Sequence, residues 1–139
     1  MNNTDLKGEY IETAICDILG RADIAFEKGQ VPLLGKEADL AIPSCADPYV
    51  IVMSSYQETT SSSQTQRANE QREIYRKLQG DNERYPSRPP RLMVNFVDGG
   101  GWLARRSDLR KMHASCDYCI NMNMRGELLD IVKYRMVQL

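Results

Sequence analysis

The stretch from residue 36 to residue 57 constrains the fold more than any other part of the chain. Residues 50–52, Val-Ile-Val, form an uninterrupted apolar run, which is typical of a strand buried on both faces. Residues 37–42 read as a second strand that ends at Pro43. The connection between them, residues 44–48, is rich in turn-forming residues. We therefore predict two neighbouring strands, the later of which is central in a sheet.

Acidic side chains in the first of these strands suggest a site. Glu37 and Asp39 alternate with Ala38 and Leu40, so the two carboxylates are expected on one face. Polar residues 54–57 follow the apolar run of the neighbouring strand. Carboxylate oxygens are the ligands that Mg²⁺ prefers. The pattern therefore predicts a binding site for a divalent cation between the two strands.

The other elements follow from periodicity and from turn residues. We expect a helix over residues 6–28 with an apolar stripe, ended by Gly29. A short strand over 31–34 and a turn at Gly35 would precede the two strands above. The remaining elements are expected as a helix over 64–79, a strand over 92–97, a short helix over 108–113, a strand over 118–122 and a helix over 127–137.

This order predicts an α/β fold with a mixed β-sheet flanked by helices. The first three strands can form an antiparallel meander. A crossover through the helix over 64–79 would then place the fourth strand parallel to the third. The 139 residues suit one domain, and no internal repeat is visible, so we expect a single domain over residues 1–139.

The composition indicates a soluble globular protein. No apolar run approaches the roughly 20 residues of a membrane-spanning helix, so no membrane partner is expected. The first residues lack the basic and apolar regions of a signal peptide. Four cysteines in a chain of this size do not indicate a disulfide framework, so a reducing cytoplasm is the expected location.

Charge is unevenly distributed along the chain. Residues 1–63 hold four Lys and Arg against ten Asp and Glu, whereas residues 64–114 hold eleven against six. An acidic first half beside a basic middle is compatible with a metal site next to a phosphate-binding surface. The alternative is that solvated faces simply differ in charge.

Three strings within this order resemble a known family. They are residues 37–43 (Glu-Ala-Asp-Leu-Ala-Ile-Pro), residues 54–65 (Ser-Ser-Tyr-Gln-Glu-Thr-Thr-Ser-Ser-Ser-Gln-Thr) and residues 97–109 (Val-Asp-Gly-Gly-Gly-Trp-Leu-Ala-Arg-Arg-Ser-Asp-Leu). Together with the expected αβββαβ order, they resemble the PD-(D/E)XK nuclease superfamily, and in particular type II restriction endonucleases. The resemblance implies a restriction-endonuclease-like core, hydrolysis of double-stranded DNA with Mg²⁺, and a homodimer.

The family motif matches this sequence in part. Asp39 corresponds to the Asp that ends the second strand of the motif, and it is the implied metal ligand. The acid and Lys positions of the next strand fall at Met53 and Ser55, or at Ser55 and Gln57 in a shifted alignment. Met53 therefore marks a position from which the acid has been lost, because a thioether does not bind Mg²⁺. Gln57 could orient a water.

Other acids could complete the metal site. Glu37 is one candidate, and Glu70 or Glu73 on the following helix is another, since some family members supply the second acid from there. Because the motif is incomplete, a catalytically inactive domain that binds DNA or a partner on the same fold is the alternative function.

Arg67, Arg105, Arg106, Arg110 and Lys111 could contact the phosphates of DNA, although such a cluster can also be a solvated face. Cys116 and Cys119 have metal-like spacing beside His113, but one such pair does not close a tetrahedral zinc site. A redox pair usually opens a helix, whereas this one enters an expected strand.

Overall fold

A computed structural model of the chain describes residues 3–56, 63–98, 110 and 113–137. In chain order, its elements are α1 (Asn3–Arg21), β1 (Glu27–Val31), β2 (Lys36–Ile42), β3 (Val50–Tyr56), α2 (Ser63–Arg84), β4 (Leu92–Asp98), β5 (Tyr118–Ile120), the 3₁₀ helix η1 (Met122–Met124) and α5 (Gly126–Val137). The expected short helix over 108–113 lies largely outside the described residues.

The five strands form one mixed sheet in the order β1-β2-β3-β4-β5. β1, β2 and β3 pair antiparallel as a meander. β4 pairs parallel to β3 after the crossover through α2, and β5 pairs parallel to β4. The predicted mixed sheet, the meander and the parallel crossover are therefore confirmed.

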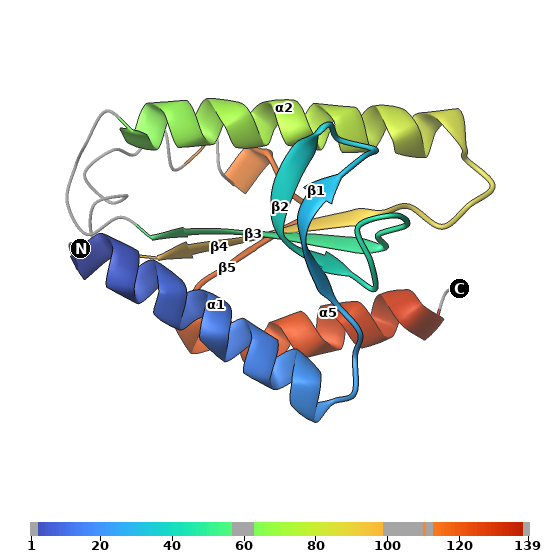
Figure 1. The fold of residues 1–139 in the computed structure, drawn as a ribbon. Coiled ribbons are helices and arrows are strands. Elements are labelled where there is room, and N and C mark those ends of the chain that lie inside the picture. Colours follow the sequence, from blue (N-terminus) through green and yellow to red (C-terminus); the bar gives the residue numbers. More distant parts are fainter. Residues whose placement is uncertain (1–2, 57–62, 99–109, 111–112, 138–139) are drawn as a thin grey trace.

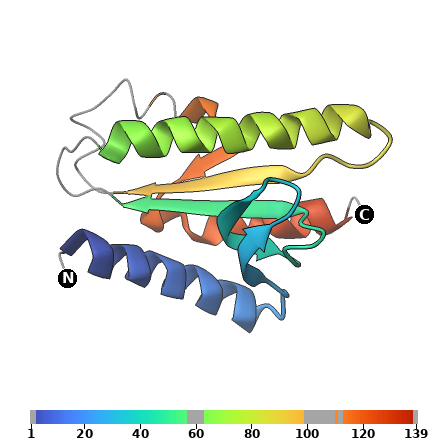
Figure 2. The ribbon, with the colours of Figure 1, turned by 45° about the horizontal axis from the view of Figure 1, so that its top comes forward.

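Helices cover both faces of the sheet. α2 lies along one face, and α1 and α5 lie on the other (Figure 1). Figure 2 shows the same three layers from a second direction. On the α1 and α5 side, Leu40, Val52 and Phe96 pack with residues of both helices. On the α2 side, Ile51 and Met53 pack with Ile74 and Leu78, among others. Val50, Ile51 and Val52 are each at most 1% exposed, so β3 is buried on both faces as predicted.

α1 ends seven residues earlier than the sequence indicated. Asp23 has a φ of 55°, and Ile24 N–H donates to Leu19 O at 3.0 Å while Asp23 N–H donates to Gly20 O at 3.1 Å. This is the hydrogen-bond pattern of a Schellman motif, with Asp23 in the left-handed position that Gly usually occupies. The prediction that Gly29 ends the helix was wrong because the sequence rule looks for Gly, whereas Asp here adopts the left-handed conformation.

The first strand was also misplaced. It spans Glu27–Val31 rather than 31–34, with a register shift between Glu27 and Gly29. Pro32 follows the strand, and Gly35, with a φ of 63°, lies in the tight turn into β2, as predicted. α2 continues through Gly80 to Arg84 instead of ending near residue 79, because an exposed Gly only weakens a helix.

Candidate active site at Asp39

Asp39 lies where β2 and β3 separate. The β2–β3 pairing comprises Leu40–Val52, Ala41–Ile51 and Ile42–Val50. One residue beyond this pairing, Asp39 Oδ2 accepts a hydrogen bond from the backbone N–H of Ser54 at 2.7 Å. The side chain thereby satisfies a donor that a continued strand pairing would have used. The separation of the strands leaves the carboxylate 26% exposed, so solvent reaches it.

Arg67 of α2 closes this cluster. Its Nη2 donates to Asp39 Oδ2 at 3.1 Å and to the backbone carbonyl of Ser54 at 2.7 Å. The guanidinium therefore joins the first turns of α2 to both separating strands. An ion pair with side chains 28% and 26% exposed is partly screened, so its contribution to stability is modest, at about 1 kcal/mol.

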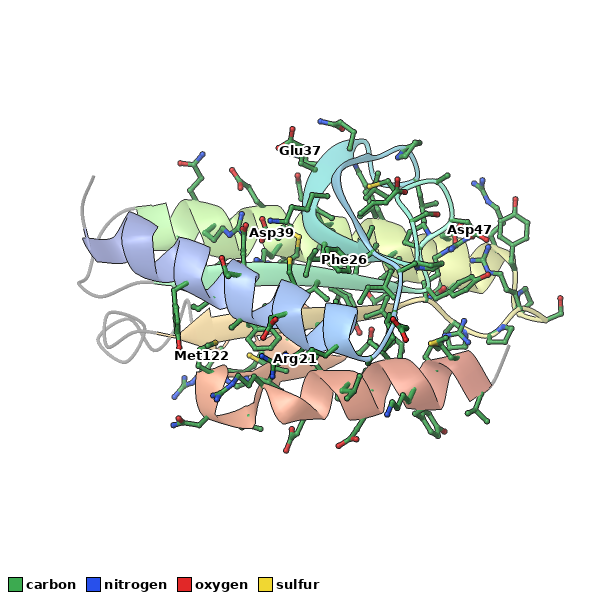
Figure 3. The ribbon with its side chains drawn as sticks, turned by 60° about the horizontal axis from the view of Figure 1, so that its bottom comes forward. Arg21, Phe26, Glu37, Asp39, Asp47 and Met122 are labelled. Atoms are coloured by element: carbon green, nitrogen blue, oxygen red, sulfur yellow. The ribbon has the colours of Figure 1, made fainter. Side chains whose placement is uncertain are left out.

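The other expected metal ligands are not gathered around Asp39. Glu37 is exposed, and Figure 3 shows it on the outer curve of β2, away from Asp39. Glu70 is half-buried on α2, where its Oε1 accepts from Gln66 Nε2 at 3.2 Å, and Glu73 is exposed. Across the described ranges, no three side chains of His, Cys, Asp or Glu are placed to hold one metal ion. The described residues thus offer Mg²⁺ one carboxylate, which already pairs with Arg67, and by themselves they do not fit the ion.

Met53, the expected lost acid position, belongs to the core. Its side chain is 3% exposed and packs in the cluster that contains Ile51, Ile74 and Leu78. A carboxylate at this position would be surrounded by apolar side chains beneath α2.

The remaining predicted site residues are described in part. Ser55 belongs to β3, Gln57 lies outside the described residues, and so do Arg105, Arg106 and Lys111. Arg110 is exposed. Among the described residues, Arg67 is therefore the only predicted DNA contact that lies beside Asp39.

Segments that are far apart in the sequence lie side by side at one edge of the sheet. β3 and β4 run parallel, and their register ends with Ser54–Phe96, Ser55–Val97 and Tyr56–Asp98. The strings that begin at residues 54 and 97 consequently start side by side, and the Asp39–Ser54 hydrogen bond brings the first string to the same edge. The described first residues of the second and third strings and Asp39 of the first string therefore lie at one edge of the sheet.

Sequence reasoning overlooked a second group of polar residues along α2. Tyr75 Oη donates to Asp117 Oδ1 at 3.0 Å, and Asp117 Oδ2 accepts from the backbone N–H of Met93 at 2.7 Å. Burial, reinforced by the charge of Asp117, raises the pKa of Tyr75 to about 12. Arg72 and Arg76 flank Tyr75 on the helix, and their spacing of four residues was the sequence signal that could have revealed them.

The cysteine pair forms a compact cluster with His113. Cys119 Sγ lies 3.9 Å from His113 Nε2, and Cys116 Sγ donates to His113 O at 3.6 Å. Hydrogen bonding with Cys119 and burial raise the pKa of Cys116, whereas hydrogen bonding with Cys116 lowers the pKa of Cys119. All four cysteines are free thiols.

Comparisons of the chain with protein-family models, curated proteins and solved structures found no match. No helix in the described part of the chain has the length and apolar character that crossing a membrane requires.

Proposed function

We propose that the chain is a DNA endonuclease domain of the type II restriction enzyme kind, which hydrolyses phosphodiester bonds of double-stranded DNA. The observation that carries the proposal is that Asp39 of the first string and the described first residues of the other two strings lie at one edge of the sheet. These strings are separated in sequence by 10 and 31 residues, since they span 37–43, 54–65 and 97–109. A shared edge is what a single active site requires of them.

The order of elements supports the same proposal. A helix, an antiparallel meander of three strands, a crossover helix and a parallel fourth strand follow the αβββαβ order that the resemblance implies. A fold alone does not imply a function. The support therefore comes from the fold together with Asp39, the residue of β2 that the resemblance makes the metal ligand.

Mg²⁺ is the proposed cofactor, with Asp39 as one ligand. A bound divalent metal would stabilise charge on the phosphate and activate a water. The described side chains do not complete such a site. By the resemblance, Glu37 or Glu70 would be the second ligand, and Gln57 would orient the water. Arg67, which donates to Asp39 Oδ2, holds that carboxylate in place at the strand edge.

By the same resemblance, we propose a homodimer that acts on symmetric sites in the cytoplasm. A two-fold protein presents two copies of the Asp39 edge, one for each DNA strand.

Cleavage of plasmid DNA with Mg²⁺ or Mn²⁺ tests the proposal, with EDTA as the blank. We expect the wild-type chain to cut and Asp39→Asn to lose cleavage by at least about 100-fold, because the variant keeps the shape of the side chain and loses its charge. Asp17→Asn is the matched control, since Asp17 is 57% exposed and pairs with Arg21 one turn away in the same helix. Equal cleavage by wild type and Asp39→Asn would remove Asp39 from the active site.

A second function is favoured by two specific observations. The pairing of Asp39 with Arg67 and the burial of Met53 both suit a domain that binds DNA or a protein partner without cutting. Tight binding of duplex DNA by a folded wild-type chain, with no cleavage under either metal, would favour this function.

A further inference from the structure

A groove runs between α2 and the segment that precedes β5. It has a volume of about 320 Å³ and is lined by Arg72, Tyr75, Arg76, Gln79, Ala114 and Ser115. Every residue of the lining is described, and none of them was a predicted site residue. The groove lies on the side of α2 that faces residues 114 and 115, and it is separate from the cluster of Asp39, Ser54 and Arg67.

The lining carries two positive charges and no acid. Arg72 and Arg76 are exposed, lie one helical turn apart and so share one side of α2. Within the described residues, neither guanidinium forms an ion pair, in contrast to Arg67, Arg88 and Arg91. Glu70 and Glu73 line the adjoining hollow along α2 together with the same two arginines, so they limit the positive surface on that side.

The floor of the groove is held in place. The Tyr75 hydroxyl is fixed by Asp117, whose other carboxylate oxygen accepts the Met93 N–H of β4. Asp117 is therefore already bonded through both oxygens. Ser115 is 2% exposed, which anchors the opposite wall. A ligand would thus meet two exposed cationic side chains over a rigid base, so the ordering on binding would fall mainly on the two arginines.

We propose that this groove binds backbone phosphates of double-stranded DNA. The inference rests on the proposed function and deepens it, because it names a second surface of the domain, outside the Asp39 cluster, that the substrate would contact. A guanidinium matches a phosphate with two parallel hydrogen bonds, so two unpaired arginines over a groove suit a phosphodiester chain.

The groove and Arg67 lie on different sides of α2. Arg72 and Arg76 follow Arg67 by five and nine residues, which correspond to about 8 Å and about 14 Å along the helix axis and to rotations of about 140° and 180° around it. The groove would therefore contact backbone phosphates away from those nearest Asp39, on DNA that passes across the side of the domain formed by α2 and residues 114 and 115.

Salt-dependent binding of a fluorescent 20-base-pair duplex in EDTA tests the inference, because EDTA separates binding from cleavage. The double variant Arg72→Gln, Arg76→Gln is compared with the double variant Arg84→Gln, Lys133→Gln, which removes the same charge from exposed positions outside the groove. We expect the groove variant to bind roughly tenfold or more weakly at 100 mM salt. The slope of log K against log salt should fall by about 1.8, for two lost phosphate contacts. The control should keep the wild-type slope.

The possible outcomes separate the two proposals. If the wild type binds the duplex and the groove variant has the wild-type slope, the groove inference is overturned and the proposed function stands. If the folded wild type does not bind the duplex even at 50 mM salt, both are overturned. If the wild type binds poly-glutamate and not the duplex, and the groove variant loses this binding, the groove would be assigned to an acidic protein partner. That result would also overturn the inference.

Discussion

Among single residues, Asp39 and Arg67 define the chemistry that the sheet edge can offer. Asp39 was predicted as a metal ligand and Arg67 as a DNA contact, and the structure joins the two in an ion pair at 3.1 Å. Nothing in the sequence places residues 39 and 67 in contact, because their meeting depends on where the crossover helix begins above the separating strands. The acid could thus be found by its position in the motif, whereas its partner could not.

Met53 allows a sharp prediction at the same scale. Met53→Glu should lower the free energy of unfolding at pH 7 by about 3–5 kcal/mol, since it places a carboxylate without a partner in an apolar cluster. Met53→Leu is the matched control and should change it by less than about 1.5 kcal/mol. Urea unfolding measures both. If Met53→Glu instead kept its stability and gained Mg²⁺-dependent cleavage, position 53 would be the lost acid position within reach of the metal.

Among the elements, the connection from α2 to β4 is fixed by a network of charges. Asp81 Oδ2 accepts from Arg88 Nη2 and from Arg91 Nε, and Arg91 Nη1 donates to Asp47 Oδ1 at 2.7 Å. Arg91, directly before β4, is 8% exposed, and the Asp81 side chain is 11% exposed, so their pair is the buried part of a network that joins α2 to the β2–β3 connection. Asp47, at 60%, lies at its solvent-exposed end. The network holds the end of the molecule opposite the Asp39 edge.

This network should make stability depend on pH. Burial alone would raise the pKa of Asp81, but the hydrogen bonds and charges of Arg88 and Arg91 outweigh it, so the pKa is lowered. A lowered pKa in the folded state contributes stability above the unfolded pKa of about 3.9, and this stability is lost as pH falls through the folded pKa. Asp81→Asn should destabilise the fold by roughly 2–4 kcal/mol at pH 7 and by much less near pH 2.

Urea unfolding of wild type and Asp81→Asn from pH 7 to pH 2 checks this dependence. Asp17→Asn provides the control, because Asp17 is in an exposed pair. A constant difference between Asp81→Asn and wild type across this range would show that the network does not depend on the charge of Asp81.

The end of α1 gives a second prediction for an element. Asp23→Gly should raise the free energy of unfolding by about 0.5–1 kcal/mol, because Gly adopts a φ of 55° without the penalty that a side chain carries. Asp23→Ala should lower it, since Ala tolerates that φ less well than Asp. Thermal unfolding compares the two, and equal melting temperatures would contradict the Schellman cap.

Elements were predictable where a long pattern supports them and less so at their ends. In α2 the apolar residues Ala68, Ile74 and Leu78 are buried at helical spacing. In α5 Leu128 and Val132 are buried, but Met136, which continues the same spacing, is 50% exposed, while Arg135 is buried and donates to Pro89 O. An Arg with a long apolar stem can take a core position when one backbone acceptor is available, which periodicity does not reveal.

For the whole molecule, the order of strands was predictable because few connections are allowed. After an antiparallel meander, a helical crossover to a parallel strand is almost always right-handed, which leaves one arrangement for the fourth strand. The site was less predictable, because it depends on strands that separate at residue 39 and on partners from distant elements. Three segments that resemble one family converge on that point, and their convergence is the main support for a nuclease.

The most direct test maps every new 5′ end in a random-sequence duplex library after incubation with the wild-type chain and Mg²⁺ or Mn²⁺. We predict ends at discrete positions that share one short sequence, and we predict that Asp39→Asn, folded to the same extent, produces none of them. A folded wild-type chain that yields no ends above the protein-free control with either metal would contradict a restriction endonuclease centred on Asp39.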